Sequence, residues 1–422
     1  MPDRVLLVGM GGREHAIAWK LRQSPLVGEI FVAPGNGGTA GIATNVPVQP
    51  KDIDGICKAA RDLRIDFYLS TMDDPQPLGL VDRLQAQGIP CYGPSQAASQ
   101  IEASKAFSKQ LMHESGIRTS GFHTFSDYSA AVAYLESRGD RPCWVKADGL
   151  AAGKGAIGCN NLAEALNAVD IAMRRRDFGS AGDTVVIEDG LIGWETSAHA
   201  ICDGTRGLLW PFASDHKRAQ DGDTGLNTGG MGAYSPSEKV TDALASEVQP
   251  DVVDRVLAAL AARGTPYTGT LFPGMMVAAD GAYVLEYNAR FGDPETQVLM
   301  PRLQGDFYAL CKAASEGDVT KAPVSWTSDA AVGVVMASGG YPATYKLGYP
   351  IRGLEDVDAD VLVFHAGTAL DADRGLVTNG GRVLTVVALG PTLAAARAKA
   401  YDNVRRISFT DAHYRTDIAA GA

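Results

Sequence analysis

Residues 5–15 read VLLVGMGGREH, a short apolar run that passes through a glycine turn into a helical pattern. Apolar runs and helical patterns then alternate over residues 15–22, 29–33, 53–63, 66–70, 78–87 and 89–92. Strands alternating with helices are typical of βαβ units, whose strands pair in parallel. The sequence therefore predicts an α/β protein that begins with a parallel-sheet domain over residues 1–100.

The remaining chain divides into a central α+β unit and a small carboxy-terminal unit. A helix is predicted over 95–115, followed by a small insertion over about 120–190 with helices 126–138 and 162–176 and strands 143–146 and 184–188. Strands 195–202, 270–278 and 282–287 and helix 241–263 extend the central unit to about residue 330. Residues 331–422 contain predicted strands 332–337, 361–364 and 383–388 and a helix over 392–407.

Composition narrows the class of protein. The 422 residues include 49 acidic and 38 basic side chains, a formal net charge of −11, with 45% hydrophobic and 21% charged residues. This balance disfavours nucleic acid as the main partner and excludes a disordered or collagen-like chain. The six scattered cysteines suggest neither a zinc ribbon nor a disulfide framework. With no apolar run near the length of a membrane span and no signal peptide pattern, a cytoplasmic enzyme is expected.

The opening glycine turn is a candidate phosphate site. Backbone N–H groups of Gly11 and Gly12 and the helix dipole could hold a phosphate, which Arg13 would also contact. A dinucleotide fingerprint would have glycine at the position of Glu14, so a phosphate monoester fits better than NAD. The alternative is a tight strand-to-helix turn without a ligand.

A second glycine-rich stretch, residues 146–155, reads KADGLAAGKG. Lys146 and Lys154 bracket a small loop suited to closure over a triphosphate. It is not a P-loop, because Asp148 and Gly155 stand where that motif has glycine and a hydroxyl residue. A glycine-rich hairpin that happens to carry lysines is the alternative.

Residues 283–295, YVLEYNARFGDPE, carry the most informative pattern. On a strand, Glu286 and Asn288 lie on one face, and a carboxylate beside an amide oxygen suits Mg²⁺ that keeps phosphate ligands. Arg290 follows on the same side, as a cation where phosphoryl charge would develop. Taken alone, this pattern of polar residues on a strand more often forms an exposed polar face than a metal site. Its coincidence with the lysine-glycine loop favours the metal site.

Residues 215–234 form a long glycine-rich segment that is predicted to be a structureless active-site loop, with a flexible surface loop as the alternative. His216 in this segment is either a general base or a solvated histidine. Near the carboxyl end, residues 378–383 are predicted to form a hairpin turn, from which Arg382 could reach a ligand phosphate.

Seven strings together resemble the glycinamide ribonucleotide synthetases of the ATP-grasp superfamily. They are GGREH at 11–15, APGN at 33–36, KADGLAAGKG at 146–155, DHKR at 215–218, NTGGMGAYSP at 227–236, RFGDPETQ at 290–297 and TNGGRV at 378–383. The resemblance runs nearly end to end. It implies an amino-terminal substrate domain (1–100), an ATP-grasp domain (101–330) with a mobile lid at about 120–190, and a carboxy-terminal domain (331–422) that closes the cleft.

The resemblance also implies a reaction. ATP would phosphorylate glycine to glycyl phosphate, which the amine of 5-phosphoribosylamine attacks to give the amide, ADP and phosphate. Site residues follow from the matching motifs. Nucleotide contacts would come from Lys105, Lys146, Gly153, Lys154, Gly155, Glu188, Leu191 and Glu195, and magnesium or manganese would bind Glu286 and Asn288. The substrate would contact Gly11, Gly12, Arg13, Asp73 and Arg382, while Asp215, Lys217 and Arg290 would line the acyl-transfer centre.

The chain departs from the family pattern at residues 71–76, which read TMDDPQ where GPEAPL is usual. Asp73 keeps a carboxylate shortened by one methylene, which changes its reach toward ribose hydroxyls. This departure leaves two alternatives to an ordinary synthetase. One is a paralogous ATP-grasp ligase that joins a different amino acid or amine, and the other is a catalytically silent nucleotide-binding protein. The sequence leaves the oligomeric state open.

Overall fold

The amino-terminal sheet is parallel, as predicted. The computed structural model describes residues 1–150 and 155–421. Five strands lie in the order β3-β2-β1-β4-β5, and all neighbouring pairs run parallel. They are β1 (Asp3–Gly9), β2 (Val27–Pro34), β3 (Thr44–Asn45), β4 (Phe67–Leu69) and β5 (Cys91–Tyr92), with helices α1 (Gly12–Leu21), α2 (Ile53–Asp62) and α3 (Leu80–Gln85) between them. Val5 to Val8 are fully buried, as expected for a strand covered on both faces.

The predicted helix over 95–115 is divided in two. Helix α4 covers Gln100–Ala103 and α5 covers Lys105–Glu114. Ser104 between them is extended, and its hydroxyl accepts a hydrogen bond from the N–H of Phe107 at 3.0 Å. An N-cap serine satisfies a donor that the first turn of a helix leaves free, so it begins a new helix here.

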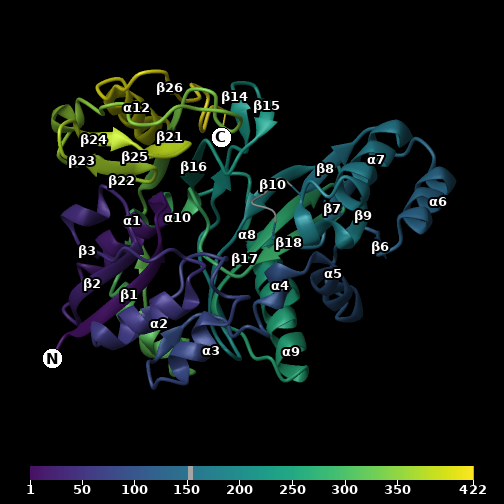
Figure 1. Cartoon of the computed structure of the whole chain (residues 1–422), viewed down its shortest axis with the longest axis horizontal. Coiled ribbons are helices and arrows are strands. Elements are labelled where there is room, and N and C mark those ends of the chain that lie inside the picture. The colour runs from purple at the N-terminus through teal and green to yellow at the C-terminus, as the bar shows by residue number, and fades with distance from the viewer. Residues whose placement is uncertain (151–154, 422) are drawn as a thin grey trace.

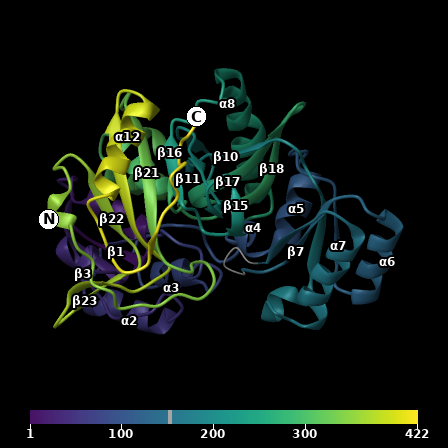
Figure 2. The same ribbon diagram turned by 90° about the horizontal axis from the view of Figure 1, so that it is seen from above.

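Residues 122–150 and 155–189 form a separate lobe, visible at one end of the molecule in Figures 1 and 2. Its antiparallel sheet has the order β6-β9-β7-β8. The strands are β6 (Phe122–Phe125), β7 (Cys143–Ala147), β8 (Ala156–Cys159) and β9 (Val185–Asp189), packed with α6 (Tyr128–Arg138) and α7 (Leu162–Val169). Regular α-helix ends at Val169, earlier than predicted, and a wider helical turn (Asp170–Arg174) continues it.

A second antiparallel sheet lies between this lobe and the parallel sheet (Figure 1). Its strands are β10 (Trp194–Ser197), β11 (Ala200–Asp203), β12 (Gly207–Leu209), β17 (Thr268–Ala278) and β18 (Gly281–Asn288). The single strand predicted over 195–202 is therefore two strands, which pair with different parts of β17. The predicted helix 241–263 is also interrupted: α8 (Asp242–Val248) and α9 (Arg255–Ala262) flank a wider turn (Gln249–Asp254) that contains Pro250, which lacks a backbone donor.

Residues 215–234 are not the structureless loop that was predicted. They contain β13 (Ser214–Asp215), the hairpin β14 (Arg218–Gln220) and β15 (Thr224–Asn227), and β16 (Gly232–Ser235). Strands β13 and β16 join the carboxy-terminal sheet in the order β13-β16-β21-β25-β22. The other members are β21 (Ala330–Ser338), β22 (Leu362–His365), β25 (Arg382–Gly390) and β26 (Ala412–His413), which pairs with β21. Helix α12 (Leu393–Val404) packs on β21 and β25.

The predicted hairpin turn at 378–383 is wrong. Strand β24 (Gly375–Thr378) pairs with β23 (Thr368–Asp371), whereas β25 pairs with β21 and β22. Both edges of β25 are thus already occupied, so the turn connects two different sheets. The remaining short elements are β19 (Leu303–Gln304), β20 (Ser325–Trp326) and helical turns at Thr39–Gly41, Gly179–Asp183, Val319–Lys321 and Leu354–Asp356.

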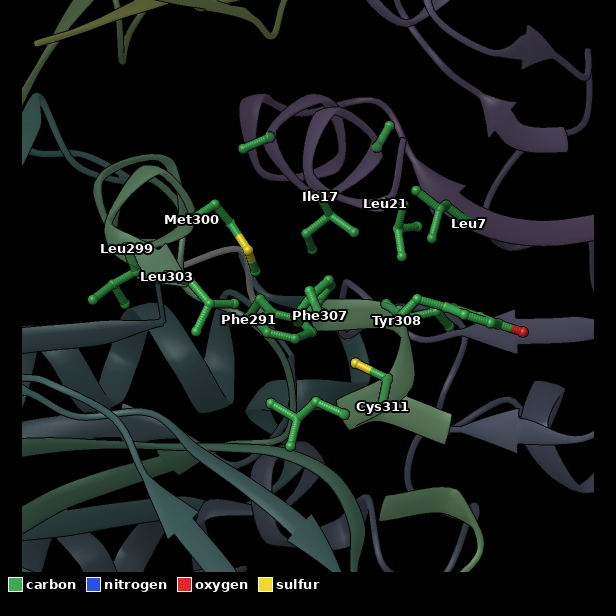
Figure 3. Close-up of a cluster of buried hydrophobic side chains, with 14 of the residues drawn as sticks. Leu7, Ile17, Leu21, Phe291, Leu299, Met300, Leu303, Phe307, Tyr308 and Cys311 are labelled. Atoms are coloured by element: carbon green, nitrogen blue, oxygen red, sulfur yellow. The ribbon is translucent and has the colours of Figure 1, made fainter. Parts of the chain in front are cut away.

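One hydrophobic cluster fastens the parallel sheet to the rest of the chain (Figure 3). Ile17 and Leu21 of α1 face Phe291 and the helices α10 (Glu295–Arg302) and α11 (Phe307–Ser315). The rings of Phe291 and Phe307 are 5.9 Å apart and meet edge to face. Among residues 1–150 and 155–421, no helix has the length and apolar character that crossing a membrane requires.

The cluster gives a stability prediction. Phe307 is 1% exposed and packs on both Phe291 and Trp210, so Phe307→Ala removes a large buried side chain from the junction. We expect a loss of about 3–5 kcal/mol in the free energy of unfolding. Leu370→Ala, at a residue that is 66% exposed, is the matched control and should change it little. Equal denaturant midpoints for the two variants would contradict this account of the core.

Candidate active site

The predicted metal pair lies at the end of β18. Glu286 and Asn288 pair with Gly274 and Phe272 of β17 without an irregularity between them, so the two side chains share a face. The Asn288 amide donates through Nδ2 to the carbonyl oxygen of Phe272 at 3.1 Å. This fixes the orientation of the side chain, and its Oδ1 accepts from Arg290 Nη2 at 3.0 Å. An amide oxygen has a second lone pair, which is available to a cation.

Positive charge gathers around Glu286 from separate parts of the chain. Desolvation opposes ionisation, but the positive charges of Lys146, Lys105 and Lys217, followed by that of Arg290, hold the pKa of Glu286 below its usual value. These cations come from β7, the start of α5, the segment after β13 and the segment after β18. The structure therefore brings together four cations that the sequence analysis predicted separately.

A buried charge triad orients Lys146. The Glu188 carboxylate lies 2.9 Å from Lys146 Nζ and 2.8 Å from Lys109 Nζ, and all three side chains are at least nine-tenths buried. Ser120 Oγ also donates to Glu188 at 2.8 Å. Burial would raise the pKa of Glu188, but the two lysines lower it. Glu188 is thus held as a carboxylate between two ammonium groups, which explains how Lys146 can stay charged although it is buried.

The structure also describes four other predicted nucleotide residues, Lys105, Gly155, Leu191 and Glu195. Lys105 Nζ donates to the carbonyl oxygen of Gly149 at 2.9 Å, and Gly155 is buried with its carbonyl paired to the N–H of Ala147. Leu191 follows β9, and Glu195 lies on β10, where burial raises its pKa and the charge of Lys217 opposes that rise. Gly153 and Lys154 lie outside the described residues.

Two of the three predicted acyl-transfer residues are paired directly. Lys217 Nζ lies 3.0 Å from Asp215 Oδ2 and 3.1 Å from Oδ1, and Asp215, with Glu195, raises the pKa of Lys217 against the effect of burial. A carboxylate that was not predicted, Glu295 at the start of α10, faces the same group. It is 3% exposed, and burial together with the charge of Asp215 raises the pKa of Glu295 to about 7.

Arg290 is held by a second residue that the sequence analysis missed. Glu102 accepts from Arg290 Nε at 3.1 Å and from the N–H of Ala289 at 2.7 Å, and its side chain is 9% exposed. Arg290 in turn donates to Asn288. Glu102 therefore fixes Arg290, and through Arg290 it fixes the amide oxygen of the metal pair.

The predicted phosphate residues converge on Asp293. Its carboxylate accepts from the N–H of Arg13 at 3.4 Å and lies 3.3 Å from Arg382 Nη1. A side chain on Gly11 would come within 2.8 Å of Asp293 Oδ2, so the Asp293 carboxylate would have to shift to admit one. The guanidinium of Arg13 is partly committed, because Nε donates to Glu14 at 2.7 Å and Nη1 to the carbonyl oxygen of Phe291 at 2.9 Å.

The remaining predicted residues, Gly12, Asp73 and His216, each have a different environment. Gly12 opens α1 with the amide of Gln297 against it, and an added Cβ would lie 2.5 Å from Gln297 Nε2. Asp73 is half-buried between β4 and α3, and its charge acts on Glu102 and Arg290. The ring of His216 is partly buried and accepts from the N–H of Ala419 at 3.1 Å. His216 thus anchors the carboxyl end and is not a solvated loop histidine.

Comparison with known families follows the same three-part division. Models of the phosphoribosylglycinamide synthetase N domain, ATP-grasp (A) domain and C domain match residues 3–102, 103–296 and 331–421. The chain belongs to the phosphoribosylglycinamide synthetase family. The resemblance predicted from the motifs is thereby confirmed, as is the ATP-grasp class of the central domain.

Relatives of this synthetase family match along nearly the whole chain. A phosphoribosylamine–glycine ligase of Allochromatium vinosum is 48% identical over 98% of this chain and 97% of its own length. A trifunctional purine biosynthetic protein of Gallus gallus is 45% identical over 99% of this chain and 42% of its own length. The crystal structure of a Thermotoga maritima phosphoribosylamine–glycine ligase matches with a TM-score of 0.84 and 32% identity, covering 99% of this chain and all of that one.

The fold extends to more distant enzymes. A biotin carboxylase from Campylobacter jejuni, whose structure holds an ATP analogue, matches with a TM-score of 0.77 over 98% of this chain and 93% of its own, at 12% identity. At that identity the match establishes the shared fold alone.

Three charged residues of the site had little or no signal in the sequence. Lys109 follows Lys105 by one helical turn, which could have placed both on one face of α5. Glu295 was part of the quoted motif but had no assigned role. Glu102 had no signal, because its partners lie 187 and 188 residues away and no spacing rule connects them.

The charge triad gives a second prediction. Glu188→Gln keeps the shape of the side chain but leaves Lys109 and Lys146 buried without the carboxylate that both of them contact. We expect a loss of about 3–5 kcal/mol in the free energy of unfolding. Glu114→Gln removes an exposed carboxylate that is paired with Arg263, and it should change the free energy of unfolding little. Denaturation of both variants, followed by circular dichroism, tests the difference; equal losses would mean that the triad is not a stabilising unit.

Proposed function

We propose that the protein joins glycine to 5-phosphoribosylamine at the expense of ATP, giving glycinamide ribonucleotide, ADP and phosphate through a glycyl phosphate intermediate. The observation that carries the proposal is the group of four cations around Glu286 and Asn288. Phosphoryl transfer to a carboxylate brings anions together, so such a reaction needs concentrated positive charge. The names of the full-length relatives support the same reaction.

The donor set fits Mg²⁺ or Mn²⁺. Glu286 and Asn288 are two residues apart on one face of the strand, and they offer one carboxylate and one amide oxygen as hard ligands. Two such ligands are too few to fill the coordination shell of the metal ion. A cation held by Glu286 and Asn288 would keep room for phosphate oxygens. When bound, the metal would supply charge neutralisation for the nucleotide phosphates.

The chain's own residues divide the remaining work. Lys105 and Lys146 are positioned to hold nucleotide phosphates, and Arg290 to offset charge on the transferring group. Lys217, fixed by Asp215, is positioned to orient the amino acid. Exclusion of water from this group of charges would strengthen each interaction and protect an acyl phosphate from hydrolysis.

The turn after β1 and Arg382 would hold the phosphate of the amine substrate. Arg382 Nη1 now donates to the carbonyl oxygens of Gly229 and Asp293, each at 2.7 Å, so it lies where three segments of the chain meet. Asp73 would reach ribose hydroxyls from the neighbouring loop. We place the amino-terminal substrate domain at residues 1–100, the ATP-grasp domain at 101–330 with a mobile lid at about 120–190, and the carboxy-terminal domain at 331–422.

The competing functions have less support. A ligase for a different amine would have no need of the phosphate residues, yet Gly11, Gly12 and Arg382 are all in place around Asp293. A silent nucleotide-binding protein would have no need of the metal pair or of Arg290. The changed sequence at residues 71–76 is therefore best interpreted as variation within the same activity.

The reaction is tested by ADP release with Mg-ATP and glycine, with phosphoribosylamine generated from ribose 5-phosphate and ammonia. We expect release only when glycine and phosphoribosylamine are both present, and a decrease by a factor of about 100 or more in Glu286→Ala. Glu247→Ala, an exposed position on α8, is the control and should retain activity. Release with another amino acid or amine would replace the proposed reaction by that of a paralogous ligase.

The ion pair between Glu102 and Arg290 predicts that a change at Glu102 weakens metal binding. Glu102→Gln cannot accept from both Arg290 and Ala289 with two charged oxygens, so Arg290 would hold Asn288 less firmly. We expect Mn²⁺ affinity, measured by electron paramagnetic resonance without turnover, to fall about 10- to 100-fold. Glu29→Gln, a distant exposed change, should leave the affinity unchanged. Wild-type affinity in Glu102→Gln would mean that Glu102 does not position the metal pair.

A further inference from the structure

Two cysteines of the separate lobe (residues 122–150 and 155–189) face each other across neighbouring strands. Cys143 of β7 is paired directly with Cys159 of β8. Opposite residues in an antiparallel pair have Cα atoms about 4.5–5.5 Å apart, which lies within the range of about 4.4–6.8 Å that a disulfide requires. The backbone therefore already has the spacing of a disulfide, although both cysteines are free thiols.

The two thiols are unequal. Cys159 Sγ donates to the carbonyl oxygen of Ile157 at 3.5 Å, and the neighbouring Cys159 side chain is the largest effect that lowers the pKa of Cys143 to about 7. The Cys143 side chain in turn raises the pKa of Cys159. Cys143 is thus the sulfur that ionises first, and Cys159 stays protonated beside it.

Arg138 supplies a cation at the same place. Its guanidinium pairs with Asp189 through Nη1 and donates from Nη2 to the carbonyl oxygen of Pro142 at 2.7 Å. The remaining donor, Nε, is buried and has no hydrogen-bond partner among the described residues. Asp189 is the residue that pairs with Cys143 across β9 and β7, and the positive charge of Arg138 lowers the pKa of Cys143. A positive charge beside the sulfur favours the thiolate over the thiol, and the thiolate is the nucleophilic form of cysteine.

The pair is also close to solvent. Cys143 is the first residue of β7 and follows the exposed Arg141 and Pro142, while Cys159 is the last residue of β8 and precedes the exposed Asn160. Strand β8 is at the edge of its sheet. Both residues are buried themselves, at 2% and 3% exposure, and each is next to an exposed residue in the chain.

We propose that Cys143 and Cys159 form a peroxide-reactive pair, in which Cys143 is the attacking thiolate and Cys159 the resolving thiol. The direct pairing of Cys143 with Cys159 in the register of β7 and β8 and the buried, unpaired Nε of Arg138 carry this proposal. It does not depend on the proposed ligase activity.

The chemistry balances with a hydroperoxide as the oxidant. The Cys143 thiolate attacks one oxygen of H₂O₂ and breaks the O–O bond, giving a sulfenic acid and hydroxide. The Cys159 sulfur then attacks the sulfenic sulfur, the S–S bond forms, and the sulfenic oxygen leaves with a proton as water. Two thiols and one peroxide thus give one disulfide and two waters. The arginine cation stabilises the anionic sulfur before the first step.

The position of the pair gives the bond a mechanical effect. Lys146, a buried lysine of the charge triad, lies three residues after Cys143 on β7. Strand β8 is the next strand in the chain after β7. A disulfide would join the two strands at the open end of this hairpin. It would therefore restrain separation of β8 from the sheet without adding a group to the charged site.

The test uses the full protein, fully reduced and then exposed to one equivalent of hydrogen peroxide. Free thiols are blocked with an alkylating reagent under denaturing conditions and peptides are mapped by mass spectrometry. We expect one intramolecular bond between Cys143 and Cys159, with a loss of about 2 Da, and Cys57, Cys91, Cys202 and Cys311 alkylated. Those four thiols, whose pKa values burial raises, are the internal control.

Single variants separate the two roles. In Cys159→Ser, Cys143 should stop at the sulfenic acid, which dimedone traps; in Cys143→Ser, peroxide should leave Cys159 unmodified. Equal oxidation of all six thiols in the wild type, or a wild type that reacts only after denaturation, would overturn the proposal. Dimedone labelling of Cys159 in Cys143→Ser would overturn the assignment of the attacking sulfur. The wild-type result decides the pairing even if a variant does not fold.

Discussion

The burial of Phe291 between Phe307 and Trp210 is the constraint on which the site depends. A buried ring in that position fixes the backbone before and after it in the chain. Charged residues lie in both of these flanking segments. Arg290, one residue before, is turned back toward Asn288 and Glu102, and Asp293, two residues after, meets Arg13 and Arg382. A hydrophobic contact thus sets the separation between the metal pair and the phosphate residues, although the rings themselves provide no ligand to the metal or to the phosphate.

The charges of the site are balanced in pairs and are not left to solvent. Three of the four cations that face the metal position are paired with a carboxylate: Lys146 with Glu188, Arg290 with Glu102 and Lys217 with Asp215. A buried cation without such a partner would lose its proton or destabilise the fold. The paired carboxylates therefore allow positive charge to be concentrated before a ligand arrives.

The sequence predicted local features well and long-range pairing poorly. The parallel sheet, the strand with Glu286 and Asn288, and the motifs that reveal the family were all readable, because each depends on residues near one another in the chain. The interruptions of the two predicted helices at Ser104 and Pro250 have causes that the sequence contains, an N-cap serine and a proline. They were not predicted, because the apolar periodicity around them favoured continuous helices. The route of residues 214–235 could not be read, since β13 and β16 take their place only when β21, about a hundred residues later, supplies the partner.

That pairing makes the carboxy-terminal unit inseparable from the middle of the chain. Strand β16 has β13 on one side and β21 on the other, so a protein ending before residue 330 would expose the hydrogen-bonding groups of β16 along a whole edge. Bare strand edges attract other strands, and such a fragment would be prone to self-association. Gene fusions and exchanges between relatives can therefore preserve this fold only when the two segments, far apart in the gene, are inherited together.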